Sequence, residues 1–386
     1  MDKTKTIAIA VVAVIVVVAA AAAVVLSNNN GDDGYEYDTS KGWYSWDPIT
    51  METKTAYFSI TPLLITAAEG IYEEIYDGTI DYSKYSMSDV PDSFLDYDSL
   101  VVSSDETTVT VQSTVRESTD ASGSKVIETV VPKNPDNLLT TSGYAAVLHA
   151  LLEMKYGEAQ AETMLWDYVY GLDKSSWTTA SMSDLYGLDI PEGVVSIVST
   201  YSLITNLEAY VDYVSEATQN GETFLMLASG ALGNSYSELG PFYEVLDSAS
   251  SSADAVFFFS NNLEDVLAAF EVVGAIYGLE DEAQQYIDDF RLHMYAINQE
   301  AQAQDRGYKV YMESNSGTAA GNGTITSDVF NMLCLENINK TDQWQTIAEE
   351  VIIDEQPDVI IFYDTNTKSW DERMRVGVSL TGGTTA

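Results

Sequence analysis

Four short stretches rich in glycine, serine, threonine and tyrosine are the parts of this sequence best suited to hold a small molecule. Glycine lets a backbone approach a bulky ligand closely, and a tyrosine can stack on a ring or ligate iron through its phenolate. Each stretch follows a strand-like run, and the helix that comes next presents free backbone N–H groups at its amino terminus. The candidate ligand-binding residues are therefore Ser142, Gly143, Tyr144, Ser229, Gly230, Tyr236, Gly321, Asn322, Thr326, Asp364 and Thr365.

Few residues of the chain are suited to covalent or metal chemistry. Cys334 is the single cysteine, so an internal disulfide framework and a cysteine-based zinc cluster are excluded. It lies in the run Met332-Leu-Cys-Leu, which predicts an apolar helix with a core thiol. His149 and His293 are the two histidines, and each lies in a predicted helix, where a structural role is the commoner one. The chain has no Walker loop, no His-Glu-x-x-His and no Gly-x-Ser-x-Gly motif. A glycosidase-type pair of carboxylates stays open among the many acids, but the sequence favours a binding protein without catalytic residues, metal or cofactor.

The charge of the chain limits its partners. It carries 60 Asp and Glu against 17 Lys and Arg, a formal net charge of −43, and such a polyanion is repelled by nucleic acid. Between Lys174 and Arg291 there is no Lys or Arg, so the stretch from Ser229 to Tyr236 offers no cation to an anionic ligand. The charge therefore predicts a neutral or cationic ligand, such as a corrinoid or a hydroxamate-type chelate, rather than a ferric catecholate.

The amino-terminal segment predicts export. Ile7 to Leu26 is an unbroken apolar run, long enough to cross the ~30 Å hydrocarbon core as a helix. Lysines precede it and acidic sequence follows, which places the rest of the chain outside the cytoplasm. Residues 1–26 are thus a membrane anchor or, alternatively, a cleaved signal segment of a secreted chain, and residues 27–48 are a polar tether. The triplets Asn322-Gly-Thr and Asn339-Lys-Thr match the N-glycosylation acceptor, although such triplets are common by chance.

The elements that position the candidate loops follow an α/β pattern. Residues 100–131 alternate β-branched and polar residues, which predicts a hairpin or small antiparallel sheet. From Asn137 onward, strand-like runs alternate with helices, as in an α/β sheet. The predicted strands of this part are Leu138–Thr141, Val194–Val198, Thr223–Ala228, Ala255–Phe259, Lys309–Met312 and Val359–Tyr363. Predicted helices occupy 61–76, 142–156, 207–217, 263–277 and 283–303. A further helix is predicted after Ser327, and another is marked by Trp344, Ile347, Val351 and Glu355.

Four stretches in this order resemble the substrate-binding proteins of ABC importers for iron–siderophore complexes, haem and cobalamin. Thr129–Tyr144 resembles the segment in which a β-hairpin ends at a proline and the first lobe begins, and Leu263–Gln304 resembles the connecting helices. Lys309–Asn339 resembles the first strand, ligand loop and helix of the second lobe, and Glu349–Tyr363 its Glu-helix-Pro-Asp-strand unit. The resemblance implies two α/β lobes joined by a long connecting helix, with the ligand between them.

The resemblance also implies a function, partners and boundaries. The chain would capture an iron chelate or corrinoid and deliver it to an ABC permease and its ATPase, docking through one glutamate on each lobe, Glu208 and Glu350. Lobe 1, with an amino-terminal extension and the hairpin, would span 49–261, the connecting helices 262–304, and lobe 2 would span 305–386. The second lobe ends earlier than the family pattern. A surface sensor or adhesin built on the same fold, without transport, is the alternative.

Overall fold

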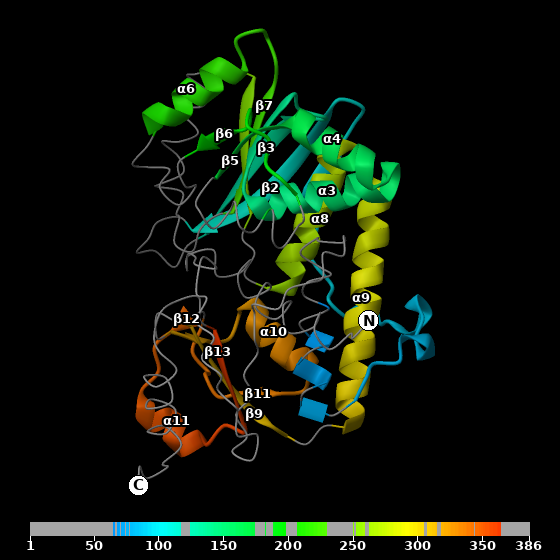
Figure 1. Ribbon diagram of the computed structural model, residues 1–386, viewed down its shortest axis with the longest axis vertical. Helices are drawn as coiled ribbons and strands as arrows, with labels where there is room; N and C mark the ends of the chain where they lie inside the picture. The colour runs from blue at the N-terminus through cyan, green and yellow to red at the C-terminus, as the bar shows by residue number, and fades with distance from the viewer. Residues whose placement is uncertain are drawn as a thin grey trace, which may run out of the picture. The chain divides into compact units, whose positions relative to one another are not determined.

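The structure, a computed structural model, falls into two compact units (Figure 1). It describes residues 65, 68–69, 71–73, 75–76, 78–116, 124–173, 182, 188–197, 207–229, 250, 252–258, 262–304, 307–314, 318–342 and 344–363. Of these, the residues up to Tyr85 and from His293 onward form unit 1, and those from Ser86 to Leu292 form unit 2. The predicted membrane segment, the tether and the residues after Tyr363 lie outside the described part of the chain. Among the described residues, no helix is long and apolar enough to cross a membrane.

Unit 2 contains a five-stranded parallel sheet. Its strands are β4 (Asn137–Thr140), β5 (Val169–Asp173), β6 (Val195–Ile197), β7 (Phe224–Ser229) and β8 (Ala253–Phe258). They lie in the order β6-β5-β4-β7-β8, and every neighbouring pair is parallel. The chain therefore begins at the central strand, adds strands on one side, and then adds the rest on the other. The continuous apolar runs of β4 and β7 are buried, as expected for a sheet covered on both faces.

Four helices of unit 2 accompany this sheet: α3 (Ser142–Tyr156), α4 (Glu158–Tyr168), α6 (Leu207–Ala217) and α8 (Leu263–Tyr277). Helix α8 is buried along nearly its whole length, which explains its almost uniformly apolar sequence. Asn262 caps it, because its side-chain oxygen accepts a bond from the Asp265 N–H, and Gly278 ends it in the left-handed region at φ 64°. These helices confirm the mixed α/β pattern that the sequence predicts.

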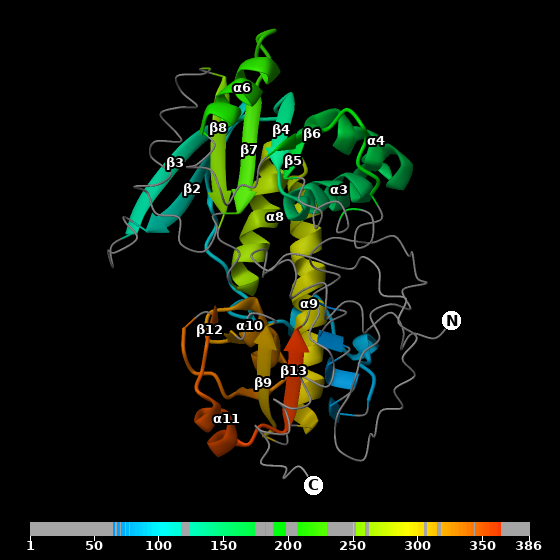
Figure 2. The same cartoon turned by 60° about the vertical axis from the view of Figure 1, so that its left-hand side comes forward.

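A three-stranded antiparallel sheet precedes the parallel one in unit 2. It consists of β1 (Val101–Ser104), β2 (Thr108–Arg116) and β3 (Ser124–Pro132), in that order. Figure 2 shows β2 and β3 side by side. Val109, Val111 and Val131 are buried, whereas Val126 and Val130 on the alternate positions of β3 are half exposed. This one-sided burial is the cause of the alternation in the sequence, and the predicted small antiparallel sheet is confirmed.

Unit 1 is built around β9 (Lys309–Ser314). This strand pairs in parallel with β13 (Val359–Tyr363) and β11 (Glu336–Asn337). It also pairs with the antiparallel β10 (Ala319–Ala320), which continues to β12 (Trp344–Gln345). Helix α10 (Ile325–Met332) follows β10, and α11 (Glu349–Glu355) precedes β13. The strands agree with the predicted runs at 309–312 and 359–363.

Two sequence predictions in unit 1 were wrong. Trp344 was expected in a helix, but it lies in β12 and pairs with Ala320, and the helix begins only after Ala348. Cys334 was expected inside an apolar helix, but α10 ends at Met332, and Cys334 has a φ of 55° and is only partly buried. Trp344 is held by a strand partner outside its local sequence, whereas α10 ends in a local turn that the Leu335 N–H closes by donating to Phe330 O.

Helix α9 (Glu280–Gln304) is the longest described helix, with 25 residues, and the boundary between the units falls inside it, after Leu292. At its start it packs closely on α8 within unit 2. A Cβ on Gly274 would lie 2.5 Å from the Cβ of Ala283, so only glycine allows this approach. That α9 serves as the rigid connector of two lobes stays a prediction.

The amino-terminal extension packs within unit 1. The described residues between 65 and 76 are helical, as the rhythm of 61–76 predicts, and a short 3-10 turn follows at Tyr82–Lys84. A second 3-10 turn, at Met87–Asp89, belongs to unit 2. Ala68, Ile71, Tyr72 and Tyr76 are buried. The Tyr76 hydroxyl donates to Leu333 O at 2.7 Å, and Gln304 donates to the Tyr72 hydroxyl. The described residues of the extension up to Tyr85 therefore belong to unit 1, where α9 and the end of α10 cover their apolar face. The lobe boundaries 49–261 and 305–386 stay a prediction.

Candidate ligand-binding site

The parallel sheet of unit 2 has a topological switch point between β4 and β7. From β4 the chain moves to β5 and β6 on one side of the sheet, and β7 and β8 occupy the other side. The connections that leave two such neighbouring strands diverge, and the crevice outside their carboxyl ends is where open α/β sheets bind ligands. The predicted residues Ser142, Gly143 and Ser229 stand at this point in the chain, directly after β4 and at the last position of β7.

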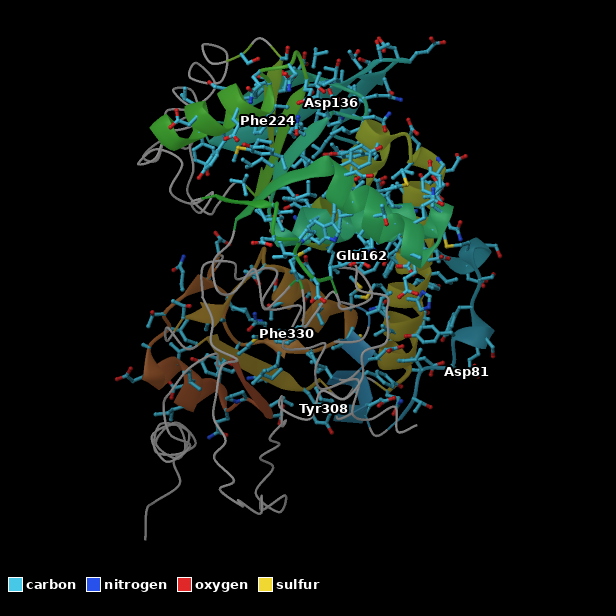
Figure 3. All side chains as sticks on the ribbon, turned by 45° about the horizontal axis from the view of Figure 1, so that its top comes forward. Asp81, Asp136, Glu162, Phe224, Tyr308 and Phe330 are labelled. Atoms are coloured by element: carbon cyan, nitrogen blue, oxygen red, sulfur yellow. The ribbon has the colours of Figure 1, made fainter. Side chains whose placement is uncertain are left out.

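The two strands at the switch point are fixed at their amino ends. The Thr223 N–H and hydroxyl both donate to the Asp136 carboxylate at 2.8 Å, and the Asp136 N–H donates to the Thr223 hydroxyl at 2.9 Å. These bonds hold the pKa of Asp136 below its usual value. Figure 3 shows Asp136 and Phe224 at the same end of the sheet. The register of β4 and β7, and with it the distance between their carboxyl ends, is thereby set.

The beginning of α3 carries no side-chain cap. Thr141 occupies the N-cap position, and its side chain makes no capping bond to the first turn. Thr140 is fully buried, and its hydroxyl has no hydrogen-bond partner. Tyr144 is 4% exposed, so its side chain packs in the core of unit 2, and a stacking role would need that side chain to move. Gly230 and Tyr236 lie outside the described residues.

The sheet of unit 1 offers a second arrangement of this kind. Strand β9 has parallel neighbours on both sides, and its carboxyl end at Ser314 pairs with Tyr363, the last residue of β13. The predicted Asp364 and Thr365 follow β13 in sequence and lie outside the described residues. The predicted Gly321 and Asn322 lie in the segment that links β10 to α10, and the predicted Thr326 lies in the first turn of α10.

Strand β10 and the linking segment together, Ala319–Thr324, are called the ligand loop below. Gly323 adopts a φ of 70°, a conformation that other residues rarely take. Thr324 caps α10 through a capping box with Ser327, and its hydroxyl donates to Gly321 O at 2.8 Å. Asn322 and Gly323 are exposed, whereas Gly321 is buried. Thr326, in the first turn of α10, is 4% exposed, and its hydroxyl has no hydrogen-bond partner. The loop therefore presents Asn322 and backbone, and the predicted Thr326 stands behind it.

The cations of the described residues are already engaged. Each of the five lysines whose side chains the structure describes lies 2.6 to 3.4 Å from a glutamate oxygen; the pairs are Lys84–Glu300, Lys133–Glu280, Lys155–Glu282, Lys309–Glu355 and Lys340–Glu336. The guanidinium of Arg291 donates to the backbone carbonyls of Pro91, Asp92 and Phe94. An anionic ligand would have to compete with these bonds for a positive charge.

The two predicted docking glutamates lie on helices of different units. Glu208 is the second residue of α6, and its side chain is outside the described set. Glu350 is exposed on α11, whose Ile352 is buried against Tyr311, Ala319 and Ile338. The bond from Lys309 to Glu355 at the end of α11 lowers the pKa of Glu355. The helix that carries Glu350 is thus anchored on its inner side.

Comparison with known proteins agrees with the predicted resemblance. Residues 231–375 match the family model for periplasmic binding proteins. The matched stretch contains α8, α9 and the whole strand framework of unit 1, and the resemblance that the sequence predicts is confirmed there. The matched family is one of binding proteins, as expected, and not of enzymes. A search of curated proteins gave no match.

Solved structures with some likeness include two ligand-binding proteins. The petrobactin-binding protein of Bacillus subtilis is 17% identical with a TM-score of 0.46, over 70% of this chain and 85% of that one. The periplasmic vitamin B12 binding protein of Vibrio cholerae is 14% identical with a TM-score of 0.43, over 64% of this chain and 84% of that one. At these scores the likenesses carry no argument about the ligand of this chain.

Sequence reasoning missed two groups of residues in unit 1. Tyr72 and Tyr76 bond Gln304 and Leu333 across more than 200 positions of sequence, a separation that no local pattern indicates. Asn337 and Asn339 donate to the ligand loop, and the sequence signal that was present, Asn339-Lys-Thr, indicated glycosylation instead. The two histidines have the structural settings that were expected: His149 is buried in α3, and the ring of His293 packs 4.7 Å from that of Tyr82.

Proposed function

We propose that this chain is the extracytoplasmic substrate-binding component of an ABC importer. In this proposal it captures an iron chelate or a corrinoid between two lobes and delivers it to the permease, without making or breaking a bond. The observation that carries the proposal is the pair of parallel strand arrangements, one in each unit, whose central strands lead into glycine-containing loops and helix amino termini. The match of residues 231–375 to the periplasmic binding proteins supports the same function.

The cargo proposed is neutral or cationic. The absence of Lys and Arg between positions 174 and 291 supports this, and so does the engagement of the described lysines with glutamates. The uncapped first turn of α3 and the exposed carboxamide of Asn322 suit neutral acceptor and donor groups, such as amide or hydroxamate oxygens. A corrinoid or a ferric hydroxamate has such groups, whereas a ferric tricatecholate would require a cluster of guanidinium or ammonium groups.

Docking to the permease is assigned to Glu208 and Glu350, and the membrane-side location to the amino-terminal segment. An exposed carboxylate on a helix that is fixed from behind gives orientation and a faster encounter with a basic partner. Glu350 has this setting on α11. The apolar run Ile7–Leu26 would hold the chain at the outer face of the membrane, or be removed on secretion.

A ligand titration tests the proposal. Residues 41–386 are purified and titrated with cobinamide, cobalamin, haem and a ferric trihydroxamate, and binding is followed by intrinsic tryptophan and tyrosine fluorescence. We expect submicromolar binding of at least one of these compounds and much weaker binding of a ferric tricatecholate. A folded sample that binds none of them contradicts the binding function, and a preference for the tricatecholate contradicts the charge argument.

A further inference from the structure

The ligand loop has little of its own to fix its conformation. Its sequence, Ala-Ala-Gly-Asn-Gly-Thr, contains two alanines and two glycines. Glycine loses more conformational freedom on folding than any other residue, so a loop of this composition needs contacts from outside in addition to its internal bond from the Thr324 hydroxyl to Gly321 O. Strand pairing supplies some of them, because Ala319 and Ala320 pair with β12 and Ala319 pairs with β9.

Two buried asparagines supply the rest from behind the loop. Asn337 Nδ2 donates to Ala320 O at 2.8 Å, and Asn339 Nδ2 donates to Ala319 O at 3.0 Å. The side chains are 6% and 1% exposed. A buried carboxamide is costly unless its bonds are made, so these two side chains and the two loop carbonyls depend on one another.

The segment after Asn339 completes the contact. Asn339 Oδ1 accepts from the Thr341 N–H at 3.1 Å and from the Thr341 hydroxyl at 2.7 Å. Thr341 O in turn accepts from the Asn322 N–H at 2.7 Å, and Lys340 O accepts from the Asn322 side chain at 3.0 Å. The triplet Asn339-Lys-Thr341 is therefore used internally, and in the folded chain its amide has no room for a glycan.

We propose that Asn337, Asn339 and Thr341, the asparagine clamp, are positioning residues that hold the ligand loop in its binding conformation before the ligand arrives. The expected effect on binding rests on the proposed function, whereas the ordering of the loop rests on the hydrogen bonds described above. A loop ordered in advance spares the ligand the entropy of ordering it, so loss of the clamp weakens binding without removing any group that touches the ligand.

The variant Asn339→Asp separates positioning from general stability. The aspartate carboxylate still accepts the bonds from Thr341, but it has no N–H to donate to Ala319 O. One of its oxygens instead faces the Ala319 carbonyl oxygen, and the two repel each other. On protonation, the neutral carboxyl regains an O–H donor toward Ala319 O. Burial and the facing Ala319 O raise the pKa of such a carboxyl, and the two bonds from Thr341 lower it. In a position that is 1% exposed the raising effects dominate, so the donor returns within a mildly acidic range. The matched control is Lys340→Gln, which changes an exposed neighbour in the same segment, whose side chain bonds Glu336 among the residues that the structure describes.

Hydrogen exchange of the full chain measures the effect. Peptides that cover 319–327 are compared as protection factors at pH 8 and pH 5, which removes the intrinsic pH dependence of exchange. We expect Asn339→Asp to lose about tenfold in protection there at pH 8 and to recover most of it at pH 5. Wild type and Lys340→Gln should show no such step. Equal protection in Asn339→Asp and wild type at both pH values overturns the proposal, and so does a loss that spreads evenly over unit 1 without recovery.

A binding arm links the clamp to the ligand. Cobinamide and the ferric trihydroxamate are titrated into wild type, Asn339→Asp and Lys340→Gln at pH 8. The proposal expects a Kd about tenfold higher for Asn339→Asp than for the other two. Unchanged affinity, with the loop shown to be unprotected, contradicts the positioning role. If wild type binds neither probe, the proposed function fails on that result, and the exchange experiment still decides whether the clamp orders the loop.

Discussion

The amino-terminal extension should be an integral part of unit 1, and Tyr76 is the residue that tests this most sharply. Its side chain is 2% exposed, its ring lies 5.2 Å from that of Tyr72 and 6.3 Å from that of Tyr308, and its hydroxyl bonds Leu333 O. Tyr76→Phe removes one buried hydrogen bond and leaves a carbonyl unpaired, at a cost of about 1–2 kcal/mol. Tyr76→Ala also removes the ring and leaves a cavity, so its cost should reach about 3–5 kcal/mol.

The assay is urea unfolding, monitored by the hydrogen exchange of peptides from α10. These peptides are chosen because Leu333 is the residue at the end of that helix. Two units need not unfold together, and peptide-level exchange reports unit 1 even when the transitions separate. The control is Tyr156→Ala, which removes a tyrosine that is 41% exposed on α3 of unit 2 and should change stability by about 0.5 kcal/mol or less. If Tyr76→Ala is as mild as this control, the extension is not part of the core of unit 1, and the reasoning is refuted.

Three further predictions concern other parts of the chain. Gly274→Ala should destabilise unit 2 by about 1–3 kcal/mol in denaturant unfolding, since its Cβ would stand 2.5 Å from that of Ala283; a neutral effect would mean that α8 and α9 separate without cost. Burial lowers the pKa of His149 in the folded state, so the free energy of unfolding should fall as pH drops below about 6.5. His149→Gln should reduce this dependence of stability on pH, and an unchanged dependence would mean that other groups cause it. The net charge of −43 makes the folded chain repel itself, so Tm should rise by at least about 2–4 °C between 0.1 and 1 M KCl, and a flat response would contradict this.

Local pattern predicted most of the elements because the α/β rhythm is strong in this chain. The run predicted at 138–141 is β4 at Asn137–Thr140, and the apolar face predicted at 263–277 is α8. The order of the strands could not be predicted from that rhythm. Which strand lies in the centre depends on pairings such as Thr140 with both Leu172 and Leu227, which join residues far apart in sequence.

The misses have the same physical origin. Trp344 follows a helical rhythm, but its backbone pairs with Ala320, and tertiary pairing overrides propensity. Tyr144 looked like a surface aromatic for stacking, yet the helix it begins turns the ring into the core. Asn339 matched the N-glycosylation acceptor because the sequence shows the triplet. The sequence does not show that the amide of Asn339 is buried and bonded to Ala319 O. Backbone position at the strand ends was predictable, whereas side-chain direction was not.

Delivery of the ligand to a permease can be measured directly as ATP hydrolysis by the importer in the presence of the loaded chain. The permease and its ATPase are reconstituted in proteoliposomes, and the chain is added empty or saturated with whichever of the four chelates it binds. We expect the loaded chain to stimulate ATP hydrolysis. The double variant Glu208→Lys and Glu350→Lys should bind the ligand with unchanged affinity but fail to stimulate hydrolysis. Equal hydrolysis with loaded, empty and charge-reversed chain would contradict this expectation.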